Sequence, residues 1–199
     1  LLCAGRTGQL LNLSALAADC GVTHNTAAAW LSVLEASHLV WRLPPWHRNL
    51  GKRLTKAPKL YFLDAWLAAW LAGVREPAEL ITGNQRGPIF ETFVVSEFIK
   101  HKRNSLGSEE LFLWRDSSGR EVGLVVERGE RLGLVEVKSG RTIADDWFAS
   151  LNRVNELAGG GARRLVVYGG NEDRLGTDTP VYGWRSVVAA ARYAVGAEG

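Results

Sequence analysis

Two β-rich segments joined by a short loop constrain the fold of this chain more than any other feature. Residues 121–127 and 132–138 are rich in valine and leucine. The four residues between them, Arg128-Gly129-Glu130-Arg131, have the length and the glycine of a hairpin loop. We therefore expect an antiparallel hairpin over residues 121–138.

The charged residues of this hairpin are candidates for catalysis. Side chains alternate between the two faces of a sheet, so Glu136 and Lys138 are expected on one face. By the same rule, Glu121 and position 123 share a face. A carboxylate and an ammonium at a strand end, opposite a second acidic strand, can hold a metal ion and orient water in a phosphodiesterase. The candidate catalytic residues are Glu121, Glu136 and Lys138.

Length and composition bound the class of protein. With 199 residues, 46% of them hydrophobic, the chain can bury a sizeable core and form one large or two small domains. No apolar run is long enough to span a bilayer and no leader pattern is present, so we expect a cytoplasmic location and no membrane partner. Cys3 and Cys20 are isolated in the sequence, which argues against a metal site or a structural disulfide. Because the chain has no methionine, we expect a piece of a longer or processed protein.

The first 40 residues have the pattern of two helices joined by a turn. Ser14 is the expected N-cap of the first helix, Gly21 ends it, and Thr23 starts the second. Apolar residues of the second helix recur at spacings of three and four, which predicts a buried stripe. The stripe consists of Ala27, Trp30, Leu31 and Leu34, and His38 continues the same spacing. The stretch resembles a winged helix-turn-helix, with wing strands at residues 40–45 and 59–62.

Basic residues are concentrated around the expected wing. Six of them occur with no acidic residue among them: Arg42, Arg48, Lys52, Arg53, Lys56 and Lys59. Such a run forms either a solvated loop or a patch that contacts nucleic-acid phosphates, and both alternatives stay open here. In contrast, no lysine or arginine occurs between Arg6 and Arg42. His24, Asn25 and Thr26 could reach DNA from the start of the second helix, but Ala27, Ala28 and Ala29 offer only methyl groups, so sequence-specific reading is not expected. We favour a structural or protein-contacting role for that helix.

The rest of the chain alternates helical and strand patterns. Expected helices cover residues 89–103, 143–157 and 186–195, and expected strands cover 111–115, the hairpin, 165–168 and 180–184. This order gives an αβββαβ core and an α/β (α+β) fold class. The polar, glycine-containing stretch 74–87 is the expected boundary. We therefore predict a winged helix-turn-helix domain at 1–80 and a second domain at 86–199.

The hairpin resembles the PD-(D/E)XK nuclease superfamily, whose core has an aspartate on one strand and Glu-X-Lys on the next. Glu136-Val137-Lys138 matches the second element, and the stretch from Gly87 to Glu91 resembles the first core helix. The resemblance implies a restriction-endonuclease-like core in which Glu91 and Glu136 bind Mg²⁺. Where the pattern places the metal-binding aspartate, this sequence has Gly123, which has no ligand atom. Glu121 is the nearby substitute.

The order of motifs along the chain also resembles a larger protein family. The helix-turn-helix, the basic wing, and the segments FLDAWLAAWL, GPIFETFVVSEF and VEVKSG resemble the C-terminal region of bacterial and archaeal ATP-binding proteins of the AAA+ type, a domain of unknown function numbered 4143. This resemblance implies an N-terminal ATPase domain of the same protein as a partner. The chain itself has no phosphate-binding-loop pattern, so ATPase activity and an ATP site are expected only outside it.

Three functions follow from these expectations. We favour a nuclease-fold scaffold, attached to an ATPase, that binds DNA or a protein partner with weak or no cleavage because position 123 is glycine. The first alternative is an active Mg²⁺-dependent DNA endonuclease, a phosphodiesterase that uses Glu121, Glu136 and Lys138. The second alternative is a winged-helix protein similar to a transcription regulator.

Overall fold

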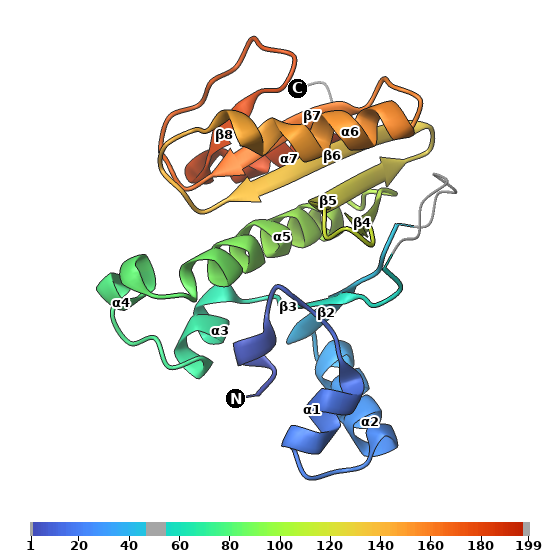
Figure 1. The fold of residues 1–199 in the computed structure, drawn as a ribbon, viewed down its shortest axis with the longest axis vertical. Helices are drawn as coiled ribbons and strands as arrows, with labels where there is room; N and C mark the ends of the chain where they lie inside the picture. The colour runs from blue at the N-terminus through green and yellow to red at the C-terminus, as the bar shows by residue number, and fades with distance from the viewer. Residues whose placement is uncertain (1, 47–54, 197–199) are drawn as a thin grey trace. The chain divides into compact units, whose positions relative to one another are not determined.

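The computed structural model describes residues 2–46 and 55–196, which form two compact units. The first unit consists of Leu1–Leu43 and Ala57–Ser96, and the second of Pro44–Lys56 and Glu97–Gly199. The described residues form seven α-helices and two β-sheets (Figure 1). This mixed composition confirms the expected α/β class. The expected domains at 1–80 and 86–199 stay a prediction.

The first unit begins with two helices joined by a turn, α1 (Leu13–Asp19) and α2 (His24–Ala36). Thr23 caps α2 through its side chain, as the sequence predicts. The cap of α1 differs from the prediction, because the side chain of Asn12 accepts the backbone hydrogen bond and Ser14 lies inside the helix. Helix α1 therefore begins at Leu13, two residues earlier than an N-cap at Ser14 would place it.

The predicted buried stripe of α2 is only partly buried. Ala27 and Leu31 lie in the core of the unit, whereas the side chains of Trp30 and Val33 are 54% and 62% exposed. The expectation for Trp30 was therefore wrong, because the helix turns this position away from the core. Two large apolar side chains of α2, Trp30 and Val33, are therefore exposed to solvent.

A three-stranded antiparallel sheet follows these helices. Its order is β1 (Gln9–Leu10), β3 (Lys59–Phe62) and β2 (Val40–Leu43), so the two predicted wing strands do pair with each other. Three further helices follow β3: α3 (Ala65–Leu71), α4 (Pro77–Thr82) and α5 (Arg86–Asn104). Helix α5 runs from the first unit into the second.

The second unit contains a five-stranded sheet of order β4-β5-β6-β7-β8. The strands are β4 (Glu110–Arg115), β5 (Glu121–Arg128), β6 (Arg131–Lys138), β7 (Arg163–Tyr168) and β8 (Val181–Gly183). The first three strands are antiparallel, and β6, β7 and β8 run parallel. Two α-helices, α6 (Ala149–Leu157) and α7 (Val187–Val195), and three 3₁₀-helices (Ala4–Arg6, Asp145–Phe148, Trp184–Ser186) complete the described elements of the chain.

Strands β5 and β6 form the predicted hairpin. Their loop is shorter than expected, since Arg128 and Arg131 already pair across the ladder and leave a turn of Gly129 and Glu130. Gly129 has φ +60°, a conformation that glycine adopts without strain and that two-residue hairpin turns require. The turn fixes the register of the two strands that carry the candidate catalytic residues.

Helices α6 and α7 cover opposite faces of the sheet (Figure 1). On one face, Leu134 packs in a cluster with Leu151 and Val154 of α6. On the other face, α7 approaches Gly133 so closely that an added Cβ would lie 2.6 Å from the carbonyl oxygen of Ala194. Glycine at this position therefore allows the close packing of helix against sheet. Across the described residues, no helix is long and apolar enough to cross a bilayer.

Candidate functional site

Strand β5 contains a β-bulge at the position where the nuclease pattern requires an aspartate. The segment of β4 from Phe112 to Trp114 spans three residues, whereas their partners Val125 and Val122 enclose a span of four. The extra residue of β5 therefore falls at Gly123 or its neighbour. Bulges commonly carry glycine because the local backbone departs from regular strand geometry.

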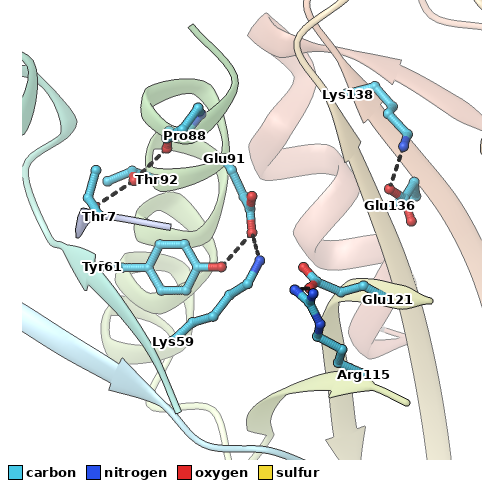
Figure 2. Close-up of polar contacts among 10 residues, drawn as sticks. All are labelled: Thr7, Lys59, Tyr61, Pro88, Glu91, Thr92, Arg115, Glu121, Glu136 and Lys138. Atoms are coloured by element: carbon cyan, nitrogen blue, oxygen red, sulfur yellow. Dashed lines mark hydrogen bonds and ion pairs between the residues drawn. The ribbon is translucent and has the colours of Figure 1, made fainter. Parts of the chain in front are cut away.

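The bulge lies beyond Val122, on the side away from Glu121, so it leaves the pairing of Glu121 unchanged. The expectation that Glu121 and position 123 share a face stays a prediction. Glu121 is paired across the ladder with Arg115 of β4. Arg115 Nη1 lies 3.1 Å from Glu121 Oε2, and Figure 2 shows the two side chains facing each other.

The turn between these two residues explains why they meet. The carboxylate of Asp116 accepts hydrogen bonds from the backbone nitrogens of Ser118 and Arg120, at 2.9 Å and 3.1 Å. Such side-chain to backbone bonds are typical of tight turns that begin with aspartate. The closed turn brings the last residue of β4 opposite the first residue of β5.

Glu136 and Lys138 form an ion pair at the end of β6. Lys138 Nζ lies 3.1 Å from Glu136 Oε1, as expected for residues that share a strand face (Figure 2). The Glu136 side chain is 12% exposed and the Lys138 side chain is 39% exposed. The Glu136 carboxylate is thus mostly buried, whereas the Lys138 ammonium is accessible to solvent.

Glu91 contacts two residues of β3 within the first unit. Lys59 Nζ lies 2.9 Å from Glu91 Oε1, and the hydroxyl of Tyr61 donates to the same oxygen at 2.5 Å (Figure 2). Lys59 and Tyr61 are two residues apart on β3 and therefore share a face. The Lys59 side chain is only 5% exposed, so its charge depends on acidic and polar neighbours.

The six basic residues predicted to contact nucleic acid lie in different environments. Arg42 is partly buried and donates through Nε to Glu35 of α2 at 2.9 Å. Lys59 is buried beside Glu91, and Lys56 is exposed. Three of the six lie outside the described residues: Arg48, Lys52 and Arg53.

Within residues 2–46 and 55–196, no group of three or more His, Cys, Asp or Glu side chains is arranged to hold a metal ion. Mg²⁺ takes oxygen ligands in octahedral geometry, and Gly123 offers none. Glu121, the substitute considered for the missing aspartate, is paired with Arg115.

Sequence reasoning missed the roles of Arg115 and Tyr61. Arg115 could have been found from the turn, because a short connection of five residues, 116–120, predicts that the last residue of one strand pairs with the first residue of the next. Tyr61 gave no signal of its own, since its partner lies 30 residues away on another element. Only the packing of α5 against β3 brings Tyr61 and Glu91 together.

Comparison with known families divides the chain into two segments. A family described as a domain of unknown function, DUF8612, matches residues 1–78, and a second, DUF4143, matches residues 86–186. Two curated relatives are similar to the chain: Uncharacterized protein Mb2031c of Mycobacterium bovis and Uncharacterized protein Rv2008c of Mycobacterium tuberculosis. Each is 31% identical over 135 residues, which is 68% of this chain and 30% of the relative.

The chain therefore spans about 30% of the length of the curated relatives it matches. No solved structure matches the chain significantly. The DUF4143 match covers the strands that carry Glu121, Glu136 and Lys138, and it extends over slightly more than half of the chain. The chain belongs to the family of the domain of unknown function DUF4143.

Proposed function

We propose that this chain is a non-catalytic binding module of a longer ATP-binding protein. In this proposal a winged helix-turn-helix and a nuclease-like core serve as a scaffold, and the ATPase domain of the same protein is one partner. The observation that carries the proposal is Gly123, which stands where a nuclease needs a metal-binding carboxylate. A scaffold needs the fold of a nuclease but not its metal.

The order of elements supports both halves of the proposed architecture. The sequence α1, α2, β2, β3 is the order of a helix-turn-helix followed by a wing. The sequence α5, β4, β5, β6, α6, β7 is the αβββαβ order expected for a nuclease-like core. The order of the elements supports the fold only, because activity depends on the side chains of the site.

The described side chains do not fit a Mg²⁺ ion. Glu136 is a suitable oxygen donor, but Gly123 lacks one and Glu121 is paired with Arg115. Mg²⁺ tolerates little deviation from octahedral geometry, so the loss of one carboxylate weakens its binding strongly. We therefore propose no step of catalysis through a metal at this site.

Helix α2 favours a protein partner over specific DNA reading. Its exposed side chains include Trp30 and Val33, which make apolar contacts and offer no base-edge pattern. Binding of DNA by this unit would depend on the basic residues near the wing, and it would be salt-sensitive and weakly selective. A mobility-shift assay on random duplexes at two salt concentrations tests this point. Strong preference for one DNA sequence would contradict it.

A cleavage assay tests the proposal directly. The chain is incubated with plasmid DNA and Mg²⁺ or Mn²⁺, beside Lys138→Ala and the control Lys100→Ala. Lys100 also pairs with a glutamate, Glu97, at 2.7 Å, but on the surface of α5. We expect all three proteins to leave the plasmid intact.

One observation favours an active endonuclease as the second candidate. The ammonium of Lys138 is solvent-accessible beside the carboxylate of Glu136, so it could contact a phosphate group. If the wild-type chain cleaves DNA, and Lys138→Ala abolishes cleavage while Lys100→Ala does not, the scaffold proposal is wrong and this candidate replaces it.

A further inference from the structure

We infer that basic side chains take the place of a divalent cation beside the candidate metal ligands Glu91, Glu121 and Glu136. Among these basic side chains, Arg115 is the one that most weakens cation binding. This inference rests on the proposed function, because it explains how the site is stable without a metal. It assigns a role to Arg115 that the nuclease pattern does not contain. Arg115 acts as a positioning residue, since it holds Glu121 and contacts no substrate.

Each of the three candidate ligands has its own basic partner. Lys59 lies 2.9 Å from Glu91, and Lys138 lies 3.1 Å from Glu136. Arg115 lies 3.1 Å from Glu121. In every case the two partners belong to the same unit, so the compensation does not depend on how the units are arranged. Three carboxylates balanced by three bases create no excess negative charge to attract a cation.

Arg115 differs from the two lysines in chemistry. A guanidinium stays protonated at every pH at which the protein is folded, and its planar donors match a carboxylate. A lysine on a flexible stem can move away, and Glu-X-Lys sites keep a lysine beside the metal-binding glutamate. The pair of Lys138 and Glu136 is therefore compatible with a metal, whereas Arg115 competes with one for the oxygens of Glu121.

Two features act on this site. Position 123 carries no side-chain ligand atom, and the turn closed by Asp116 places Arg115 opposite Glu121. Glu121, the substitute considered for the missing aspartate, is thereby paired with a guanidinium. Backbone geometry and charge thus act in the same direction.

The test measures Mn²⁺ binding by calorimetry and by the shift of the melting temperature. The proteins are the wild-type chain, Arg115→Gln, and Arg115→Gln combined with Glu121→Gln. We expect no saturable binding by the wild type below about 1 mM Mn²⁺. Arg115→Gln is expected to bind Mn²⁺ about tenfold more tightly. The double variant should lose this gain, because the freed carboxylate is absent.

A matched control is Arg153→Gln, which removes another arginine–glutamate pair of the same unit. Arg153 Nη1 lies 3.3 Å from Glu156 Oε2 on the exposed side of α6. This variant should bind Mn²⁺ like the wild type. Equal Mn²⁺ affinity in Arg115→Gln and Arg153→Gln would overturn the inference, and so would tight binding by the wild type.

A gain-of-donor variant sharpens the result. Gly123 does not have a positive φ, so its backbone accepts an aspartate without strain at φ. Gly123→Asp together with Arg115→Gln should bind Mn²⁺ more tightly than Arg115→Gln alone. If the buried aspartate prevents folding, the comparison of Arg115→Gln with Arg153→Gln still decides the inference.

The outcomes separate this inference from the proposed function. DNA cleavage by the wild type, lost in Lys138→Ala, would defeat the scaffold proposal whatever Arg115→Gln does to Mn²⁺ affinity. An absence of cleavage with no gain of affinity in Arg115→Gln would leave the scaffold proposal intact and defeat the inference about Arg115.

Discussion

Two lysine–glutamate pairs of similar length lie in opposite environments. In the pair of Lys59 and Glu91 the lysine is 5% exposed and the glutamate 21%, whereas in the pair of Lys138 and Glu136 the lysine is 39% exposed and the glutamate 12%. A buried ammonium loses its hydration and needs a fixed carboxylate. An exposed ammonium keeps its hydration and can leave its partner. The first pair therefore acts as a structural link, and the second can exchange partners.

The neighbours of each pair agree with this difference. Tyr61 donates to the carboxylate of Glu91, so a third group on β3 fixes that oxygen. Lys138 is the last residue of β6, where the strand ends. The distances between lysine nitrogen and glutamate oxygen, 2.9 Å and 3.1 Å, are too similar to distinguish the roles of the two pairs. The exposure of each charged group distinguishes them.

The largest effect is expected when the buried pair is broken. Glu91→Gln keeps the shape of the side chain but removes the negative charge beside the buried Lys59 ammonium. We expect the free energy of unfolding to fall by about 2–3 kcal/mol, somewhat less than for a fully buried pair because Glu91 is partly exposed. Urea denaturation followed by tryptophan fluorescence measures this change.

The control for this substitution lies on the same helix. Glu97→Gln removes a surface pair with Lys100 at 2.7 Å and should change the free energy of unfolding by about 0–0.5 kcal/mol. Adding Lys59→Met to Glu91→Gln removes the buried charge and should restore part of the lost stability. A loss in Glu91→Gln no larger than in Glu97→Gln would remove the distinction between the two pairs.

A smaller effect is expected at the pair of Lys138 and Glu136. Lys138→Ala leaves the mostly buried carboxylate of Glu136 without this partner, but the ammonium that it removes is already hydrated, so the free energy of unfolding should fall by about 1–2 kcal/mol, less than in Glu91→Gln. Thermal unfolding at low and high salt measures the change, and its salt dependence should be slight. A loss as large as that of Glu91→Gln would show that Lys138 is a structural residue.

The sequence predicted much of the fold but little of the site. Periodicity and turn residues were sufficient for the β5–β6 hairpin, for α5 and for the cap of α2 at Thr23, because these are local patterns. The exposure of Trp30 was missed, since a helix repeats its apolar residues in the same way whether or not a neighbour covers them. Local patterns predict elements, and packing decides which faces are buried.

The bulge at Gly123 shows why the site was harder to predict. Strand alternation assumes an unbroken ladder, and one extra residue reverses the face of every residue beyond it. The sequence EVGLVV contains a glycine but does not say whether that glycine marks a bulge or a regular strand position. The pairing of β4 with β5 beyond Val122 depends on this single backbone irregularity.

The smallest effect concerns a carboxylate that needs no lysine, Glu79 of α4. Hydrogen bonds from the backbone nitrogen of Arg75, and then of Glu76, lower the pKa of Glu79 below its ordinary value. A lowered pKa means that the stabilisation is present above the ordinary glutamate pKa and is lost as pH falls through the lowered value.

An NMR titration of the Glu79 carboxyl carbon, with the backbone amide of Glu76 as a second probe, should follow this change. Both probes should report the same lowered pKa, and in Glu79→Gln the amide should no longer titrate. A Glu79 pKa at or above its ordinary value would mean that the backbone donors bind this carboxylate too weakly to replace a basic partner. The comparison of ion pairs would then apply only to carboxylates paired with lysine or arginine.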